Sequence, residues 1–211
     1  ELENRKVNVT WQLPQGTRSE MIDTEVVTAL YKTGCRNLTY GPESGSPRLL
    51  KEIKKRANLD AMEKSIKGAN KVGLYTHVNL IIGMPGETWH DLWLSYKFLL
   101  KMAVIGTHSL SDQIFGPYPG SAMYDELVKA GKIDFEDESH YYGSLLRGGK
   151  ILQSYNDNYD YKLLRRLQLF GLLSFWGLQY LCRPHRFIKT MYNLMISGAQ
   201  ESIMDNFLQS K

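Results

Sequence analysis

The chain has 211 residues, of which 43% are apolar, 23% charged and 11% aromatic. This length suffices for one domain with a core and a small appendage, and the balanced composition excludes intrinsically disordered and disulfide-rich classes. The net charge of +4 is too small to indicate nucleic-acid binding, so we expect no nucleic-acid partner. The two cysteines, Cys35 and Cys182, are far apart in sequence, which predicts no metal site and fits a reducing, cytoplasmic compartment.

The N-terminal end predicts that the protein is longer than this chain. The first residue is Glu1, not Met, and the stretch up to Lys6 is charged, unlike the apolar region of a signal peptide. A strand-like run, Val7–Trp11, follows almost at once. We therefore expect a missing N-terminal part of the same protein to act as a partner of this chain.

Short β-like runs alternate with helical patterns up to about Ile133. Three further strands are predicted by their β-branched and apolar residues: Arg36–Tyr40, His77–Ile82 and Ser109–Phe115. Apolar residues nearly fill His77–Ile82, which predicts a strand covered on both faces. Because parallel neighbours need a long crossover, the alternation predicts a parallel α/β sheet with right-handed connections. Four strands make half of a closed barrel, so we expect further strands upstream.

The predicted helices each begin at an N-cap residue, and these caps are, in chain order, Asp23, Ser46, Asp60, Thr88 and Ser121. The helices themselves are predicted at about 24–33, from 47 onward, at 60–72, at 88–105 and from 122 to about 130. The choice of Asp60 depends on Glu63, which stands three residues later as in a capping box.

The sequence changes character after about Phe135, which predicts an α/β core at 1–135 and a mainly helical C-terminal extension at 136–211. The run Leu163–Leu181 is a dense apolar helix candidate, and residues 147–189 carry an excess of Lys and Arg. This run barely reaches bilayer thickness, and its flanking Arg pairs disfavour a span. Two alternatives remain open: an interfacial helix that makes peripheral membrane contact, and a helix packed over the barrel or a missing domain.

The chemistry is expected in the loops that follow the strands, because ligands bind at the carboxyl ends of parallel strands. These loops are Leu13–Arg18, Gly41–Ser46, Gly83–Thr88 and Gly116–Ser121, and all contain both Gly and Pro. Glu43 and Ser44 could hold a hydroxyl-rich or ammonium-bearing ligand. Each loop alone could equally be an ordinary strand-to-helix turn with an N-cap.

Three sequence motifs carry a family resemblance: Tyr40-Gly41-Pro42-Glu43-Ser44-Gly45-Ser46, Ile81-Ile82-Gly83-Met84-Pro85-Gly86-Glu87-Thr88 and Pro117-Tyr118-Pro119-Gly120-Ser121. In combination they resemble the later strands of the radical S-adenosylmethionine superfamily. The most similar branch often carries an upstream cobalamin-binding domain and includes the anaerobic magnesium-protoporphyrin IX monomethyl ester cyclase-like proteins. The resemblance implies an α/β fold with strands three to six of a partial TIM-type (β/α)6 barrel.

The resemblance also implies roles for matching residues in binding S-adenosylmethionine. Glu43 and Ser44 match positions that face the ribose and methionine region, and Lys55 matches a basic position that pairs with the methionine carboxylate. Asn79 matches a polar position that contacts the ribose. The adenine pocket is implied at Ile81, Gly83 and the loop Phe115–Pro119, including Pro117. Lys55 lies in a charge run, so a solvated lysine is the alternative.

The chain departs from the superfamily in one respect. The hallmark CxxxCxxC, whose thiolates hold a 4Fe–4S cluster, is absent from this sequence, so the cluster ligands are expected upstream. The glycine-rich motif that holds the methionine amine is also expected upstream. Cys35 is interpreted as a core thiol, because free cysteines are usually buried.

The leading hypothesis is a fragment of a radical S-adenosylmethionine enzyme that reductively cleaves its cofactor to start radical chemistry. Its expected cofactors are S-adenosylmethionine and a 4Fe–4S cluster, with cobalamin as an additional candidate, and its expected substrate is a small molecule or a tetrapyrrole-like compound. The first alternative is a non-catalytic α/β module that binds a nucleoside or a partner protein. The second is a phosphate-binding barrel, which would need free backbone amides at helix N-termini.

Overall fold

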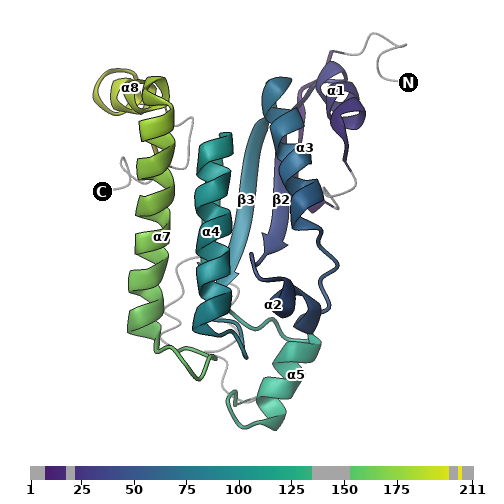
Figure 1. Ribbon diagram of the computed structural model, residues 1–211, viewed down its shortest axis with the longest axis vertical. Helices are drawn as coiled ribbons and strands as arrows, with labels where there is room; N and C mark the ends of the chain where they lie inside the picture. The colour runs from purple at the N-terminus through teal and green to yellow at the C-terminus, as the bar shows by residue number, and fades with distance from the viewer. Residues whose placement is uncertain (1–7, 18–21, 135–152, 200–203, 206–211) are drawn as a thin grey trace.

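The computed structural model describes residues 8–17, 22–134, 153–199 and 204–205. Four strands form one parallel sheet in the order β1-β2-β3-β4, and helices connect them (Figure 1). The strands are β1 Trp11–Thr17, β2 Cys35–Glu43, β3 Tyr75–Ile82 and β4 Ser109–Ile114. The predicted α/β class with a parallel sheet is therefore confirmed, and closure into a barrel stays a prediction.

The first strand begins at Trp11, so its prediction at Val7–Trp11 was wrong. The backbone N–H of Trp11 donates to the carbonyl of Gly34 at 3.1 Å, and the Trp11 indole donates to the carbonyl of Thr33 at 2.9 Å. Pairing with β2 therefore fixes where the strand starts, and local β propensity does not. Pro14 is tolerated within β1 because this strand lies at the edge of the sheet.

The helices follow the predicted caps with one exception. They are α1 Thr24–Lys32, α2 Pro47–Glu52, α3 Leu59–Lys71, α4 Trp89–Ile105, α5 Ala122–Lys129, α7 Tyr161–Cys182, α8 Pro184–Tyr192 and the π-helical turn η2 Asn193–Ser197. The cap of α3 is Asn58, whose side chain accepts from the N–H of Ala61, so the capping box predicted at Asp60 was wrong. Glu63 instead forms a salt bridge with Lys67, in which Nζ of Lys67 lies 2.6 Å from Oε1 of Glu63.

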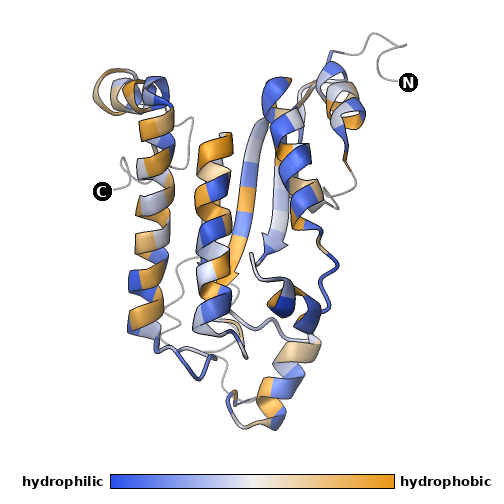
Figure 2. Ribbon diagram, in the orientation of Figure 1, coloured by the Kyte–Doolittle hydropathy of each residue, from blue (hydrophilic) through white to orange (hydrophobic). Residues whose placement is uncertain are grey.

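The helices cover one face of the sheet, and the side chains of β3 alternate accordingly. Val78, Leu80 and Ile82 are fully buried toward the helices, whereas the residues between them are half-buried. The alternation of apolar and polar residues along β3 is also visible by hydropathy (Figure 2). The prediction that β3 is covered on both faces was therefore wrong within the described part of the chain, because its apolar residues alternate with Tyr75, His77 and Asn79.

Helix α7 extends the helical layer beyond α4, where it packs on α4 and β4 (Figure 1). Leu164, Phe175 and Trp176 are its buried apolar residues. Gly171 permits this approach, because a Cβ atom there would lie 2.7 Å from the ring of Tyr96. The helix predicted at Leu163–Leu181 is thus present and packed. The expected boundary between 1–135 and 136–211 lies outside the described residues.

Candidate functional site

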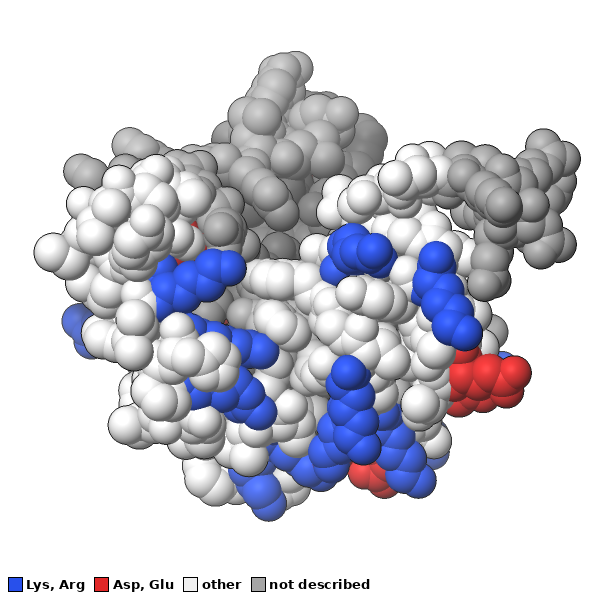
Figure 3. All heavy atoms as spheres, turned by 90° about the horizontal axis from the view of Figure 1, so that it is seen from above, with Lys and Arg blue, Asp and Glu red and all other residues white. Residues whose placement is uncertain are grey.

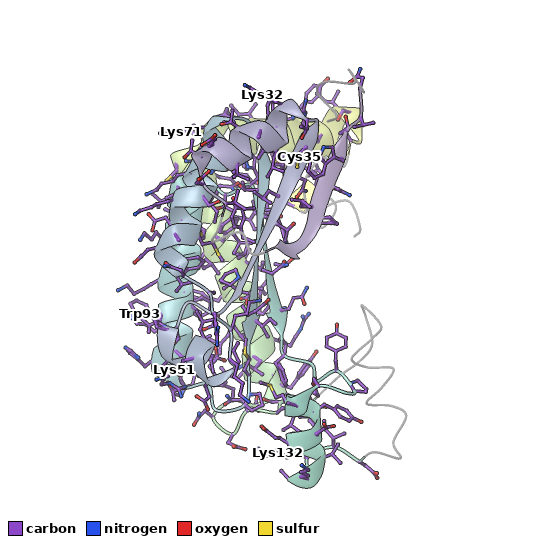
Figure 4. All side chains as sticks on the ribbon, turned by 90° about the vertical axis from the view of Figure 1, so that its right-hand side faces the viewer. Lys32, Cys35, Lys51, Lys71, Trp93 and Lys132 are labelled. Carbon is purple, nitrogen blue, oxygen red and sulfur yellow. The ribbon has the colours of Figure 1, made fainter. Side chains whose placement is uncertain are left out.

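The face of the sheet that turns away from α3 and α4 carries a row of polar side chains, which we call the polar wall. In Figure 4, where Lys71 and Trp93 mark α3 and α4, both helices lie on one side of the strands. In a parallel sheet, residues in register share a face, as Asn79 and Ser111 do. The polar wall consists of Asn37, Thr39, Tyr75, His77, Asn79, Ser109, Ser111 and Gln113, with Gln12 on β1.

Asn79 is the one polar-wall residue that the sequence predicted as a ligand contact. Its Oδ1 lies 2.8 Å from Nε2 of His77, and its amide nitrogen makes no hydrogen bond to another described residue. Asn79 therefore keeps a donor that a ligand hydroxyl could accept. The other members of the wall were missed, although the period-two pattern of Tyr75, His77 and Asn79 could have revealed them.

Glu43 and Lys55 meet at the carboxyl end of β2. Nζ of Lys55 donates to Oε1 of Glu43 at 2.8 Å, and both side chains stay partly accessible, with exposures of 40% and 26%. The backbone of Glu43 has a φ of 70°, and the β2–β3 register shifts just before it. A non-glycine residue in this left-handed region is strained, as is common at functional sites. The structure thus brings two predicted site residues into direct contact.

The end of α2 explains how Lys55 reaches Glu43. Lys54 adopts a left-handed conformation with a φ of 57°, and the N–H of Lys55 donates to the carbonyl of Leu50 at 2.8 Å. This closing turn ends α2 in the manner of a helix C-cap. The chain therefore leaves the helix with the Lys55 side chain directed at the carboxyl edge of the sheet.

Ser44 follows Glu43 in the sequence, but its surroundings differ from those of Glu43. Its side chain is fully buried, and its Oγ lies 3.1 Å from Oγ of Ser95 on α4. The Ser44 hydroxyl also accepts from the N–H of Ser46 at 3.0 Å. Ser44 therefore fastens the loop to α4, and its predicted ligand contact has no support from this geometry.

A charged network joins the loops that follow β2 and β3. Asp91 accepts hydrogen bonds from the hydroxyls of Ser46 and Thr88, each at 2.5 Å, and from Nε of Arg48 at 3.1 Å. Burial alone would raise the pKa of Asp91, but Arg48 and the two hydroxyls hold it well below its ordinary value. Asp91 thus stays ionised and fixes the two loops relative to each other. Sequence reasoning missed this role, because the contact from Ser46 to Asp91 spans distant residues.

The loop Gly83–Thr88 after β3 is fixed by a hydrogen bond within the loop and by contacts from the segment 153–182. The N–H of Gly83 donates to Oε2 of Glu87 at 2.6 Å, and a Cβ atom on Gly83 would lie 2.7 Å from Leu164 of α7. The side-chain amide of Asn156 donates to the carbonyls of Met84 at 2.5 Å and Glu87 at 3.0 Å. Gly83 is therefore required by the close approach of α7, and Asn156 clamps the loop that follows it.

Two buried acids lie beneath α7. Burial raises the pKa of Glu87 to about 7, with a further increase from Asp91. Burial and the neighbouring Glu87 raise the pKa of Asp112 well above its ordinary value. Among the described residues, neither Oδ atom of Asp112 nor Oε1 of Glu87 has a hydrogen-bond partner. These side chains are therefore protonated more readily than ordinary carboxyl groups.

The remaining predicted residues lie along the same edge. Ile81 is half-buried on the face of the polar wall, where it offers an apolar surface. The N–H of Phe115 donates to the carbonyl of Ile82 at 2.8 Å, and its ring packs edge-on against Tyr155 with centroids 6.2 Å apart. Pro117 is buried in the next turn. The structure therefore places Ile81 beside the polar wall and uses Phe115 and Pro117 for packing at its edge.

Cys35 is buried at the start of β2, as the sequence predicted for a core thiol. Its Sγ donates to the carbonyl of Asn37 at 3.4 Å, and burial raises the pKa of the thiol. Cys182 is exposed at the end of α7. Within the part of the chain that the structure describes, no group of three or more His, Cys, Asp or Glu side chains is placed to hold a metal ion.

Comparison with known proteins assigns this arrangement of strands and loops to a family. Residues 9–99, which include the polar wall up to β3, match the family model described as Radical SAM superfamily. This segment of the chain is therefore similar to the radical SAM superfamily. The resemblance on which the sequence prediction relied is therefore confirmed. The matched segment contains Glu43, Lys55 and Asn79.

Proteins similar in sequence to this chain include two methyltransferases and a cyclase. Cytidylyl-2-hydroxyethylphosphonate methyltransferase of Streptomyces wedmorensis is 33% identical over 140 residues, which cover 63% of this chain and 26% of that protein. Bacteriochlorophyllide d C-8(2)-methyltransferase of Chlorobaculum tepidum is 30% identical over 161 residues, which cover 69% and 35%. Anaerobic magnesium-protoporphyrin IX monomethyl ester cyclase of Rubrivivax gelatinosus is 24% identical over 138 residues, which cover 64% and 24%. The chain thus spans about a third or less of these relatives.

Proposed function

We propose that this chain supplies one side of the S-adenosylmethionine pocket in a radical SAM enzyme that starts radical chemistry on a small-molecule or tetrapyrrole-like substrate. The observation that carries the proposal is the position of the Glu43–Lys55 pair at the carboxyl edge of the sheet, next to the polar wall. Both features lie within the segment that matches the superfamily. The carboxyl edge is where parallel α/β folds bind their ligands.

The residues present fit the chemistry of S-adenosylmethionine. Its carboxylate needs a cation, and Lys55 is partly exposed with one carboxylate partner, Glu43. Its ribose hydroxyls need hydrogen-bonding side chains, and Asn79 keeps an amide donor on the polar wall. Its adenine ring needs an apolar surface, which Ile81 offers on the same face.

Each residue has a defined task in this proposal. Glu43 holds the Lys55 ammonium in place before the ligand binds and can then accept a hydrogen bond from the ligand ammonium or a hydroxyl. Asn79, oriented by its contact with His77, donates to the ribose. The loop Gly83–Thr88, clamped by Asn156, keeps the edge of the pocket rigid.

The chemistry itself comes from the cofactors. When bound and reduced through a 4Fe–4S cluster, S-adenosylmethionine supplies a 5′-deoxyadenosyl radical, and cobalamin can supply a methyl carrier in some members of the superfamily. We propose that the intact protein carries the cluster ligands, and any cobalamin-binding domain, in a segment that precedes these residues. The methyltransferases among the relatives support a methyl transfer, and the cyclase supports an oxidative ring closure.

The test is the affinity of the intact protein for S-adenosylmethionine, measured anaerobically by equilibrium dialysis with its iron content determined in parallel. Lys55→Gln removes a charge-assisted hydrogen bond and should weaken binding by roughly tenfold or more. Lys51→Gln is the matched control, because Lys51 is an exposed residue of the same segment outside the Glu43 pair. Its affinity should equal that of the unaltered protein.

Adenosine, which lacks the methionine group, separates the two halves of the proposed pocket. Asn79→Ala should weaken both adenosine and S-adenosylmethionine binding, whereas Lys55→Gln should leave adenosine binding unchanged. Unaltered affinities in both variants, with the iron content retained, would disprove the assigned pocket. Equal affinity for adenosine and S-adenosylmethionine in the unaltered protein would favour the nucleoside-binding module.

A further inference from the structure

The helix formed by α8 and η2 buries polar side chains and exposes apolar ones, which is the reverse of an ordinary surface helix. Thr190 and Asn193 are buried, with exposures of 7% and 3%, while Ile188, Met195 and Ile196 have exposures of 67%, 74% and 72%. A surface helix normally buries its apolar side and exposes its polar side. The spacing of Ile188, Tyr192, Met195 and Ile196 places them along one outward stripe. We call these four residues, together with Leu181 at the end of α7, the apolar stripe.

The segment that carries the apolar stripe has basic but no acidic residues. Residues 181–199 contain Arg183, Arg186 and Lys189 and no Asp or Glu. Figure 3, which views the molecule from the end where α8 lies, shows Lys and Arg side chains spread over this end with few acidic ones. A second copy of the chain would bring the same positive charges together in a symmetric contact, which disfavours self-association through this face.

Two arginines fix α8 to the end of α4. Arg183 donates to the carbonyls of Ala103 at 3.1 Å and Val104 at 3.0 Å, and Arg186 donates to the carbonyl of Gly106 at 3.2 Å. Guanidinium groups at these carbonyls complement the negative end of the helix dipole. The outward direction of the apolar stripe is therefore built into the fold.

A cavity of about 360 Å³ opens between α8 and the amino ends of β3 and β4. Its lining includes Tyr75 and His108 at the sheet, Trp176 on α7, and Arg186 and Lys189 on α8, together with Asp205. Arg186 bonds only backbone carbonyls among the described residues, while Asp205, the described carboxylate in the lining, accepts from the side-chain amide of Asn193 at 3.1 Å. Because Arg186 and Lys189 outnumber Asp205 among the charged residues of the described lining, the cavity favours a small anionic group.

His108 contributes a second donor to this cavity. Its Nδ1 accepts from the N–H of Thr76 at 3.2 Å, and burial together with Arg186 and Arg183 lowers its pKa to about 4. The imidazole is thus neutral at physiological pH and carries its proton on Nε2. That N–H has no partner among the described residues, so it remains able to donate to an anion.

We propose that the apolar stripe and this cavity together form a docking site for an anionic lipid surface. The stripe enters the boundary between head groups and acyl chains, while Arg186 and the His108 N–H receive a head-group phosphate. Within the described residues no helix is long and apolar enough to cross a membrane. An amphipathic helix with basic flanks can instead lie in the membrane interface. The Glu43–Lys55 pair lies at the opposite end of the sheet, facing away from the lipid (Figure 1).

This site differs from the membrane contact that the sequence left open as one of two alternatives, which involved Leu163–Leu181. Leu164, Phe175 and Trp176 of that run are buried against the rest of the fold. Phe170 and Leu173 are exposed at 62% and 59%, but they lie on the middle of α7, away from the cavity. They therefore supply matched control positions for the proposal.

Cosedimentation of the intact protein tests the proposal, with vesicles of phosphatidylcholine alone or mixed in equal parts with phosphatidylglycerol. Binding should require phosphatidylglycerol and weaken as salt is added. Ile188→Ser and Met195→Ser should each weaken vesicle binding by roughly tenfold, in line with the burial of a large apolar side chain. Phe170→Ser and Leu173→Ser should leave it unchanged.

Arg186→Gln tests the cavity and should reduce vesicle binding by about fivefold, as expected for one basic residue at an anionic surface. Lys162→Gln, at the other end of α7, should have no effect. Absence of the protein from every vesicle pellet would overturn the proposal, as would equal losses in the Phe170 and Ile188 variants. Full displacement from vesicles by millimolar inorganic phosphate at constant ionic strength would instead assign the cavity to a free anion.

Discussion

The two faces of β3 differ in the side chains that they carry and in how far these are buried. On one face Val78, Leu80 and Ile82 are buried beneath the helices, and on the other His77 and Asn79 form part of the polar wall. The same eight-residue strand therefore contributes to the core through every second side chain and to the proposed cofactor pocket through the others. Stability and ligand binding should accordingly respond to different substitutions, even at adjacent positions.

Truncation of two neighbouring isoleucines gives the largest expected contrast. Ile82 has an exposure of 1% and packs with Leu92, Tyr159 and Leu164, whereas Ile81 is half-buried on the polar wall. Ile82→Ala should lower the free energy of unfolding by about 3 kcal/mol, since it leaves a cavity in the core. Ile81→Ala should lower it by roughly 1 kcal/mol or less. Urea denaturation measures both, and equal losses would remove the distinction between the faces.

The covered face also contains Glu87, whose titration should appear in the stability of the protein. Its pKa rises from 4.5 to about 7 on folding, so the folded protein holds this proton more tightly than the unfolded chain. The resulting stabilisation is present below about pH 4.5 and is lost as the pH rises through about 7. Glu87→Gln should therefore flatten the decline in unfolding free energy over this window by up to roughly 3 kcal/mol.

Denaturation series at several pH values measure the effect of Glu87→Gln. Part of the slope should persist, because burial raises the pKa of Asp112 as well. Glu126→Gln on α5 is the control, since Glu126 is exposed, and it should retain the full slope. An unchanged slope in the Glu87 variant would indicate that the carboxyl group is not buried in solution.

The sequence was most informative where a feature depends on a few neighbouring residues. Asp23, Ser46, Thr88 and Ser121 were predicted as N-caps and serve as such, because a cap bonds an N–H only three residues away. Asn58 was missed because Asp60 and Glu63 offer a competing capping pattern nearby. Local signals of similar strength cannot be ranked without the packing of the finished helix.

Features that depend on contacts between residues distant in sequence were harder to predict. The start of β1 is set by pairing with β2 at Trp11, which no local pattern encodes. The contact between the hydroxyls of Ser44 and Ser95, at 3.1 Å, joins residues far apart in sequence and was not predicted, while the ligand contact of Ser44 stays a prediction. The proximity of Glu43 and Lys55, by contrast, could be predicted from the resemblance to the superfamily, because both residues match positions that bind the same ligand. The polar wall could have been found from the alternation in β3 alone.

The smallest expected effect concerns Asn156, which joins the segment before α7 to the loop after β3. Its side-chain amide donates to the carbonyls of Met84 and Glu87, and the side chain is 6% exposed. Asn156→Ala leaves two carbonyls of a buried loop without this partner, which should cost about 1 to 2 kcal/mol of unfolding free energy. Asn158→Ala is the matched control, because Asn158 is exposed and its side-chain amide donates to one described carbonyl, that of Glu87, at 3.0 Å.

The Asn156 variant also relates the two faces of β3 to each other. Faster hydrogen exchange at the N–H of Gly83 would indicate that the clamp on the covered side keeps the pocket edge rigid, since this N–H bonds Glu87 within the clamped loop. Affinity for S-adenosylmethionine should then fall by less than in Lys55→Gln, because no ligand contact is removed. If Asn156→Ala and Asn158→Ala lose equal stability, and exchange at Gly83 is unaltered in both, the clamp does not operate and the two faces are independent.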